Sequence, residues 1–321
     1  MNDVVTFEHS LVDEDIAYAM RVEKAKELIS NRHSKATREA YASDWSLFQT
    51  WCKGNKFKAL PASAESVVMF IEYLVDIEFK ASTIGRKLAA IKYEHSKAGI
   101  NSPTDLEPVK AAYAGAKRMK GTKPKQAAPL TIDLMVKILE TCDTKKIRGI
   151  RDKAILAIGF GGALRRAELA NLTVKDIQIT ESGLMVDIRK SKTDQEGKGQ
   201  RIAILQGNNV QVKTLYKQWL RASGIKSGYV FRGIDRKGKL NKNITPKQIY
   251  NIVKSKASLA GLDPAQFSGH SLRAGFITSA AQNDADVFSI MDVSRHKNMN
   301  TVRQYVRNAN LFKKHAGSEF M

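Results

Sequence analysis

The side chains best suited to catalysis lie in the second half of the chain, in four short motifs. They comprise arginines that can clamp an anion, histidines and a lysine that can transfer protons, and a tyrosine that can act as a nucleophile. These residues are Arg165, Lys192, His270, Arg273, His296 and Tyr305. Each motif alone is compatible with an ion pair, a solvated turn or a helix surface, whereas their joint occurrence favours one catalytic site.

The spacing within the motifs predicts which side chains share a face. His270 and Arg273 are three residues apart, so a helix would place them one turn apart on the same side. Arg165 and Glu168 have the same separation, which is typical of an ion pair on a helix. Lys192 falls in a predicted turn between two strands, where a long side chain can reach in several directions.

The second half of the chain predicts a mixture of helices and short strands around these motifs. The apolar run Ala154–Phe160 predicts a buried helix, and the pattern after Asn209 is mostly helical. Between them, short apolar and alternating runs predict strands joined by turns. The strands are predicted at Val174–Thr180, Leu184–Arg189 and Arg201–Leu205.

The chain of 321 residues is strongly basic. It holds 53 Lys and Arg against 32 Asp and Glu, which gives a net charge of +21. Such an excess favours a polyanion, with nucleic acid as the first candidate and an anionic membrane surface as the second. No basic amphipathic helix with a large aromatic face supports the membrane alternative, and a generally soluble basic protein is the third interpretation.

The first half of the chain predicts four helices. Apolar residues recur every three or four positions, and Ser63 and Ser82 are suitable N-caps for two of the helices. Basic residues beside the apolar faces are expected to point outward, where they either contact phosphates or only solvate the surface. The candidates for phosphate contact in these helices are Lys35, Arg38, Arg86, Lys87 and Lys92.

Composition predicts four regions along the chain. Residues 1–20 are an acidic tail without Lys or Arg, and 21–116 form a helical DNA-binding domain. Residues 117–128 are a basic linker with Gly and Pro, in which Lys123 and Lys125 are candidates for phosphate contact. Residues 129–321 form the second domain, which ends in a tail at 306–321.

The cysteines and the apolar runs restrict the class of protein further. Two cysteines are too few for a disulfide framework or a cysteine-based zinc site, which favours a reduced, cytoplasmic protein. The chain begins without the basic and apolar segments of a signal peptide. It also has no run of about 20 apolar residues such as a membrane span needs.

The motifs resemble the active site of the tyrosine site-specific recombinases, the family of phage integrases. The most specific parts are His270-Ser271-Leu272-Arg273 and the spacing from His296 to Tyr305. The resemblance covers the whole chain and implies a mainly α fold with a small antiparallel β-sheet. An all-helical core-binding domain would precede an α+β catalytic domain, in the two-domain architecture of Cre.

The resemblance also implies a role for each residue. Tyr305 would attack the scissile phosphate and form a 3′-phosphotyrosyl bond, so that neither a metal nor ATP nor another cofactor is required. Arg165 and Arg273 would bind the non-bridging oxygens, and Lys192 would protonate the leaving 5′ oxygen. His270 would form a hydrogen bond to the phosphate and accept the tyrosine proton, and His296 would donate to a phosphate oxygen. Glu168 would orient Arg165 or His270.

Two residues depart from the commonest pattern of the family. Arg166 stands where an apolar residue often follows the first arginine, and Arg295 replaces a Gly often found before the second histidine. Arg295 would either perturb the packing of the site or add a phosphate contact. The remaining histidines and tyrosines match no motif. The histidines expected at the surface are His9, His33, His95 and His315, and the tyrosines outside the motif include Tyr216 and Tyr250.

The expected partners follow from the same resemblance. They are double-stranded DNA with inverted-repeat sites and a homotetramer assembled on two paired sites, in which the tail 306–321 packs on a neighbouring subunit. The alternatives are a type IB topoisomerase-like enzyme, which shares the attack by tyrosine, and a DNA-binding protein that has the fold without the catalysis.

Overall fold

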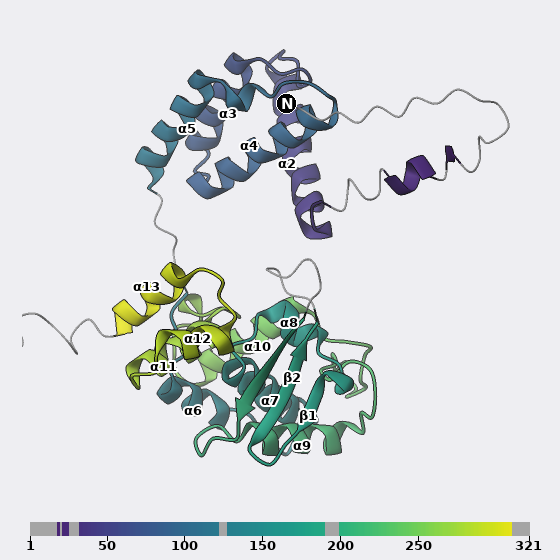
Figure 1. The fold of residues 1–321 in the computed structure, drawn as a ribbon, viewed down its shortest axis with the longest axis vertical. Coiled ribbons are helices and arrows are strands. Elements are labelled where there is room, and N and C mark those ends of the chain that lie inside the picture. Colours follow the sequence, from purple (N-terminus) through teal and green to yellow (C-terminus); the bar gives the residue numbers. More distant parts are fainter. Residues whose placement is uncertain (1–17, 20, 26–31, 122–126, 190–198, 310–321) are drawn as a thin grey trace, which may run out of the picture. The chain divides into compact units, whose positions relative to one another are not determined.

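The computed structural model describes residues 18–19, 21–25, 32–121, 127–189 and 199–309. The chain divides into two compact units, Met1–Lys125 and Gln126–Met321 (Figure 1). Each unit has its own buried apolar core. The predicted positions Lys123, Lys125 and Lys192, together with most of the tail 306–321, lie outside the described residues.

The first unit is helical, with an apolar core contributed by every long helix. Ser63 caps its second helix by accepting a hydrogen bond from the Ser66 amide at 3.1 Å, as the sequence predicts. The predicted cap Ser82 is wrong, because the next helix begins one residue earlier and the Lys80 carbonyl accepts its first amide bonds. The helices are α2 (Lys35–Gly54), α3 (Ala64–Asp76), α4 (Ala81–Lys97), η1 (Pro103–Asp105) and α5 (Glu107–Lys120).

The last helix of this unit extends into the predicted linker. Residues 117–120 are the last turn of α5, with three basic side chains at its C-terminal end. Cations are favoured there because the last carbonyl groups carry the negative end of the helix dipole. The basic composition of 117–120 therefore belongs to a helix end, whereas the expectation was a segment outside the helix.

The second unit combines helices with a three-stranded sheet. Its helices are α6 (Ile132–Glu140), α7 (Ile147–Gly161), α8 (Arg166–Asn171), α9 (Val212–Ser223), α10 (Pro246–Leu259), α11 (Ser271–Gln282), α12 (Val287–Ser294) and α13 (Met299–Ala309). Short 3-10 turns lie at η2 (Val174–Asp176) and η3 (Pro264–Gln266). Among the described residues, no helix is both long enough and apolar enough to cross a membrane.

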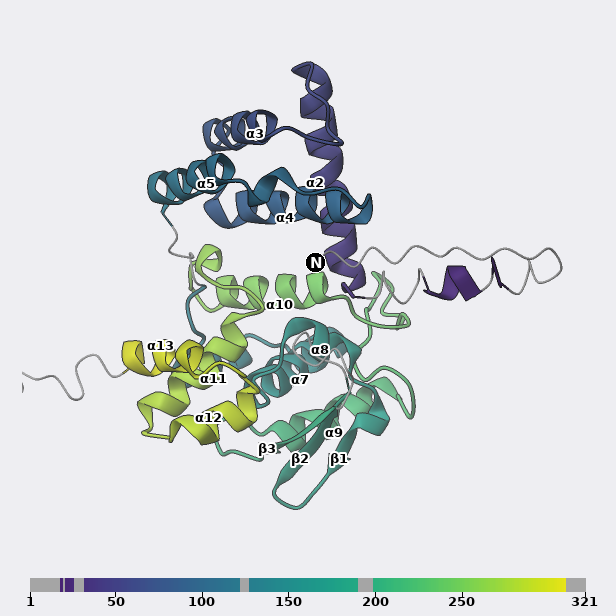
Figure 2. The ribbon, with the colours of Figure 1, turned by 45° about the horizontal axis from the view of Figure 1, so that its top comes forward.

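The sheet is antiparallel in the order β1 (Ile177–Ile179), β2 (Gly183–Ile188) and β3 (Gln200–Leu205). Every second residue of β2 and β3 is buried, and this face packs on α7 and α9 (Figure 2). The second and third strands lie where the sequence predicts them. The first is shorter than predicted, because Asp176 accepts the Thr173 amide at 2.8 Å and closes a 3-10 turn.

Two glycines let other segments approach the elements that carry the motifs. A Cβ at Gly161, at the end of α7, would lie 2.7 Å from the side chain of Ile204 in β3. A Cβ at Gly275 in α11 would lie 1.9 Å from the carbonyl oxygen of Leu130. Glycine is therefore required where β3 packs against α7 and where the backbone at Leu130 packs against α11.

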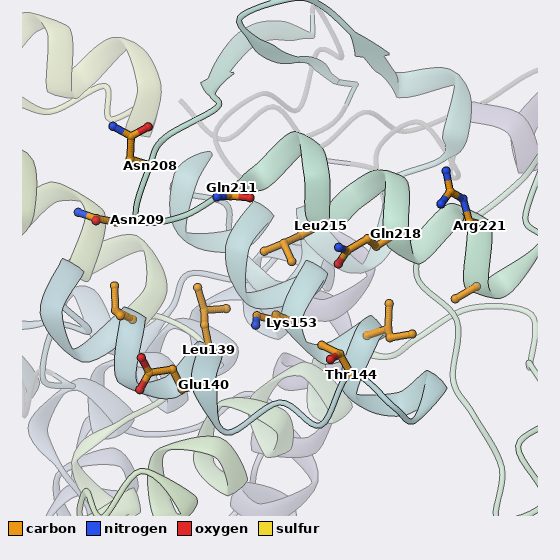
Figure 3. Close-up of a pocket in the computed structure, with 13 residues that line it drawn as sticks. Leu139, Glu140, Thr144, Lys153, Asn208, Asn209, Gln211, Leu215, Gln218 and Arg221 are labelled. Atoms are coloured by element: carbon orange, nitrogen blue, oxygen red, sulfur yellow. The ribbon is translucent and has the colours of Figure 1, made fainter.

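A pocket of about 690 Å³ lies between α6, α7 and α9 (Figure 3). Leu139 and Leu215 supply part of its apolar lining, and Glu140, Lys153 and Arg221 supply charge. None of the residues of the predicted catalytic motifs lines it. The described catalytic candidates lie instead at the ends of α8, α11 and α12 and within α13.

Candidate active site

The ends of three helices and the interior of a fourth carry the described motif residues. Arg165 is the N-cap of α8, and His270 is the N-cap of α11, with Arg273 in its first turn. His296 follows the C-cap of α12. Tyr305 lies in α13, which packs on α11 and α12. Segments separated by up to 140 residues in the sequence thus contribute to one part of the second unit.

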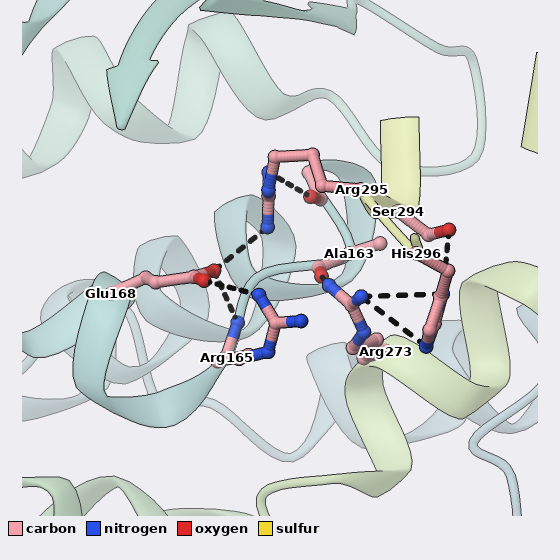
Figure 4. Close-up of polar contacts among 8 residues, drawn as sticks. Ala163, Arg165, Glu168, Arg273, Ser294, Arg295 and His296 are labelled. Atoms are coloured by element: carbon pink, nitrogen blue, oxygen red, sulfur yellow. Dashed lines mark hydrogen bonds and ion pairs between the residues drawn. The ribbon is translucent and has the colours of Figure 1, made fainter. Parts of the chain in front are cut away.

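Glu168 is the buried centre of the arginine cluster. Its Oε1 accepts a hydrogen bond from Arg165 Nη1 at 2.7 Å, and its Oε2 accepts the Arg165 amide at 2.9 Å. The same Oε2 accepts Arg295 Nη2 at 2.7 Å. Figure 4 shows the carboxylate between the two guanidinium groups. Glu168 thus contacts the first arginine of the motif; its predicted role in orienting that residue remains a prediction.

Arg295 is buried within the site. Its side chain is 2% exposed, and the phosphate contact expected as one alternative for it remains a prediction. It also fits without displacing the motif residues, because Nη2 pairs with Glu168 and Nη1 is directed to the Gly162 carbonyl at 3.5 Å. Burial is the main reason that the pKa of Arg295 is lowered. The motif pattern did not predict this buried ion pair.

Arg273 is buried between two uncharged partners. Its Nη1 donates to the Ala163 carbonyl at 2.8 Å, and its Nη2 lies 3.2 and 3.3 Å from the two ring nitrogens of His296. Burial, followed by the charges of Arg165 and Arg295, lowers the pKa of Arg273 to about 9. A bound anion would offset both the cost of burying the Arg273 charge and the repulsion among these cations.

His296 is held as a neutral imidazole. Its Nδ1 lies 2.9 Å from the hydroxyl of Ser294. Burial is the main cause that lowers its pKa to about 3, and the charges of Arg273 and Arg165 add to it. A neutral ring can donate one hydrogen bond and accept another, which suits a contact with a phosphate oxygen.

Tyr305 is half-buried in a small apolar cluster formed by α11, α12 and α13. Ile277, Ile290 and Val302 belong to that cluster. Burial raises the pKa of the Tyr305 phenol, whereas the positive charge of Arg273 lowers it. The phenol is therefore protonated at neutral pH, and an attack on phosphorus requires an acceptor for its proton.

His270 is exposed at the start of α11, and its amide donates to Ser268 Oγ at 3.1 Å. Beside it, Arg166 packs so tightly on Gly269 that a Cβ there would lie 1.9 Å from the Arg166 side chain. The Arg166 guanidinium lies over the ring of Tyr250, 5.6 Å from its centroid. The residue after the first arginine is thus accommodated at the protein surface.

The net charge of the site favours binding of an anion. Among the described residues, Arg165, Arg273 and Arg295 surround one carboxylate, Glu168. With His296 neutral, two positive charges remain uncompensated in a largely buried volume. Low local dielectric strengthens the attraction of such a cluster for a phosphate.

The DNA-contact candidates of the first unit fall into two groups. Lys35, Arg38, Arg86 and Lys92 are at least partly exposed on α2 and α4, and their contacts with DNA remain predictions. The expectation that Lys87 points outward is wrong. Its side chain is 5% exposed, and its Nζ donates to Asp44 at 2.8 Å inside the unit.

His95 also corrects the expectation of a surface residue. It is fully buried, and its Nε2 accepts the Ala62 amide at 2.9 Å while Nδ1 lies 2.8 Å from the Ile91 carbonyl. Both corrections could have been found from the spacing. Lys87 and His95 lie three and eleven residues after Ile84, and so on the same apolar face of α4.

Comparison with known proteins agrees with the fold and the site. Residues 129–311 match the phage integrase family, and residues 25–97 match the N-terminal SAM-like domain of phage integrases. An integrase/recombinase xerD homolog from Selenomonas ruminantium is 38% identical over 299 residues, covering 91% of this chain and 87% of the relative. Recombinase cre of Escherichia phage P1 is 26% identical, with 80% of each protein covered.

A solved structure shows that the fold is shared as well. The Tn1549 transposon integrase in complex with transposon right end DNA superposes with a TM-score of 0.63 at 14% identity, covering 90% of this chain and 97% of that one. The two family matches cover both units and place the chain among the DNA-recombining enzymes. The chain belongs to the phage integrase family, and as a tyrosine recombinase it cleaves and rejoins DNA in site-specific recombination.

Proposed function

We propose that the protein cuts each DNA strand through a 3′-phosphotyrosyl intermediate on Tyr305, without metal or ATP. The observation that carries this proposal is the cluster of Arg165, Arg273 and His296, which offers donors to one phosphate at the ends of α8, α11 and α12. The charge of Arg273 acts on the Tyr305 phenol, which supports its position near the same phosphate.

In the first step the Tyr305 oxygen forms a bond to phosphorus, and the bond from phosphorus to the 5′ oxygen breaks. His270, exposed at the start of α11, accepts the phenol proton, and Lys192 gives a proton to the leaving 5′ oxygen. Arg165 and Arg273 bind the negative charge that develops on the non-bridging oxygens. His296, as a neutral ring, donates one further hydrogen bond.

In the second step a 5′ hydroxyl from the partner strand attacks the phosphotyrosine, and the tyrosine leaves with its proton restored. One phosphoester bond is formed for each one broken, so the energy of the DNA backbone is conserved and no nucleotide cofactor is consumed. We propose that a homotetramer carries out these steps on two paired inverted-repeat sites. The location proposed for this reaction is the cytoplasm of a bacterial cell.

The experiment is the capture of the covalent intermediate. A duplex with a nick close to the cleavage position loses its 5′ hydroxyl fragment after cleavage, so a protein–DNA adduct that resists denaturant should accumulate. Tyr305→Phe removes the attacking oxygen and should abolish the adduct completely, because no other group can form the phosphoester. The measurement is the fraction of DNA shifted on a denaturing gel.

Tyr250→Phe is the matched control. The hydrogen bond from Lys254 lowers the pKa of Tyr250 in spite of a smaller opposing effect of burial, which makes this phenol a suitable rival nucleophile to test. The Tyr250→Phe variant should still form the adduct. An adduct that persists in Tyr305→Phe, or wild-type protein that forms none, contradicts the proposed function.

A further inference from the structure

The backbone at Arg295 has a conformation that is unfavourable for its residue type. Arg295 is the C-cap of α12 with φ 56° and ψ 42°, in the left-handed region. Glycine occupies this region without a penalty, whereas any residue with a Cβ is disfavoured there. The Arg295 side chain makes an interaction that can offset this cost.

That interaction is the buried pair with Glu168. The Arg295 side chain is 2% exposed, Nη2 donates to Glu168 at 2.7 Å, and Nη1 is directed to the Gly162 carbonyl. The Nε atom has no hydrogen-bond partner among the residues that the structure describes. Arg295 is thus held by one strong contact at the far end of its guanidinium, and that contact is to the carboxylate that holds Arg165.

The contact joins two segments that are distant in the sequence. One is the turn from Gly162 to Arg165, which carries the first arginine and the Ala163 carbonyl that binds Arg273. The other is the end of α12, from which His296 follows directly. Figure 4 shows that Arg295 reaches across from the second segment to Glu168, on the side of the cluster away from His296.

We propose that Arg295 is a positioning residue that acts through Glu168, fixing Arg165 and the His296 segment in register with one another around the scissile phosphate. The proposal rests on the proposed function, because it concerns the same phosphate. A carboxylate shared by two guanidinium groups has its lone pairs engaged from both sides, so Glu168 can hold Arg165 in only one orientation. In this role Arg295 itself contacts no DNA.

The test uses the nicked duplex and Arg295→Gly, which removes the side chain and suits the left-handed backbone. Loss of a supporting contact of this kind should slow adduct formation by about 10- to 100-fold at saturating DNA. Affinity for the duplex should change by less than about threefold, because the proposed role of Arg295 is exerted through Glu168 and includes no phosphate contact. Arg221→Ala removes one exposed arginine of α9 and should leave the rate of adduct formation unchanged.

A second substrate separates positioning from a general loss of structure. In a methylphosphonate duplex, a methyl group replaces one non-bridging oxygen at the scissile position, so the phosphorus centre carries no charge and depends less on Arg165. The defect of Arg295→Gly should shrink to within about threefold of wild type on this duplex, as should the defect of Arg165→Ala. Arg295→Lys, which keeps a charge that can reach Glu168, should recover part of the rate on the ordinary duplex.

An equal defect on both duplexes would show that Arg295 only maintains the fold and would overturn the inference. A wild-type rate for Arg295→Gly on the ordinary duplex would overturn it as well. Both outcomes are distinct from failure of the proposed function, in which the wild-type protein itself would form no adduct on Tyr305.

Discussion

Two buried carboxylates, one in each unit, are each held between two cations. In the first unit, Asp44 accepts Arg86 Nε at 2.7 Å and Lys87 Nζ at 2.8 Å. In the second unit, Glu168 accepts one hydrogen bond of 2.7 Å from each of two arginine side chains. Both carboxylates are 2% to 3% exposed, so the local chemistry of the two sites is nearly the same.

The neighbours of the two carboxylates differ. Lys87 is buried and Arg86 is half-exposed, so solvent stabilises the excess charge around Asp44. Beside Glu168 lies Arg273, which is 3% exposed and bonded to a carbonyl and a neutral ring. Counted over the described residues, the second cluster therefore holds more positive than negative charge in a largely buried volume.

The comparison shows how a structural ion pair differs from a binding site. Burial opposes ionisation of Asp44, but the bonds from Arg86 and Lys87 outweigh it and the pKa of Asp44 is lowered. At Arg273 the charged form is disfavoured, because burial and neighbouring cations lower its pKa to about 9. In the first cluster the buried Lys87 is paired with a carboxylate, whereas the second cluster would be stabilised by a bound anion.

The largest effect on stability is expected at Asp44. Asp44→Asn keeps the shape but leaves the buried Lys87 without a counter-charge, which should lower the free energy of unfolding of the first unit by about 3 to 5 kcal/mol. Denaturant unfolding of the full chain, followed by tryptophan fluorescence, measures this change. The double variant Asp44→Asn/Lys87→Met replaces the buried charge by an apolar side chain and should recover most of the loss. A full loss in the double variant would show that the ion pair is not the cause.

The comparison is tested next at Arg273. Arg273→Met removes an uncompensated cation, so adduct formation should slow by about 100- to 1,000-fold while stability is unchanged or higher. Lys87→Met is the matched variant in the first unit and should leave the rate of adduct formation unaffected. The measurements are single-turnover cleavage and the midpoint of thermal unfolding. Equal effects of both substitutions on cleavage would remove the distinction between the two clusters.

The sequence could predict which catalytic candidates lie on shared helix faces, because their chemistry restricts their type and their spacing. His270 and Arg273 are one helical turn apart in any helix, and two of the three strands follow from alternating apolar residues. These predictions depend on local geometry alone. They remain valid when the first residue of the helix or strand is shifted by one or two positions.

The errors arose where a charged residue is stabilised by a distant partner. Lys87 was placed at the surface by its type, yet it is buried because Asp44 lies 43 residues away in the sequence and 2.8 Å away in space. The contact of Arg295 with Glu168 spans 127 residues. The spacing along α4 places Lys87 on the apolar face, but no local pattern names its partner, so the ion pair that permits the burial becomes visible only in the folded chain.

The smallest predicted effect concerns pH and His296. Its pKa is lowered to about 3 in the folded protein, against about 6.5 in an unfolded chain, so the unfolded state binds more protons between these values. Stability from the neutral ring is therefore fully present above pH 6.5 and is lost as pH falls through this window. By pH 5 the loss should be about 1 to 2 kcal/mol, which is less than the effects at Asp44 and Arg273.

His296→Asn removes the titrating ring and isolates this contribution. The difference in unfolding free energy between wild type and variant should narrow from pH 7 to pH 5, whereas the contributions of the other histidines cancel between the two proteins. A phosphate bound at the cluster would add negative charge beside the ring and raise its pKa, so a bound DNA duplex should weaken the pH dependence. If the difference were constant across this window, His296 would not be held neutral by Arg273 and Arg165, and the second cluster would carry less excess charge than the structure indicates.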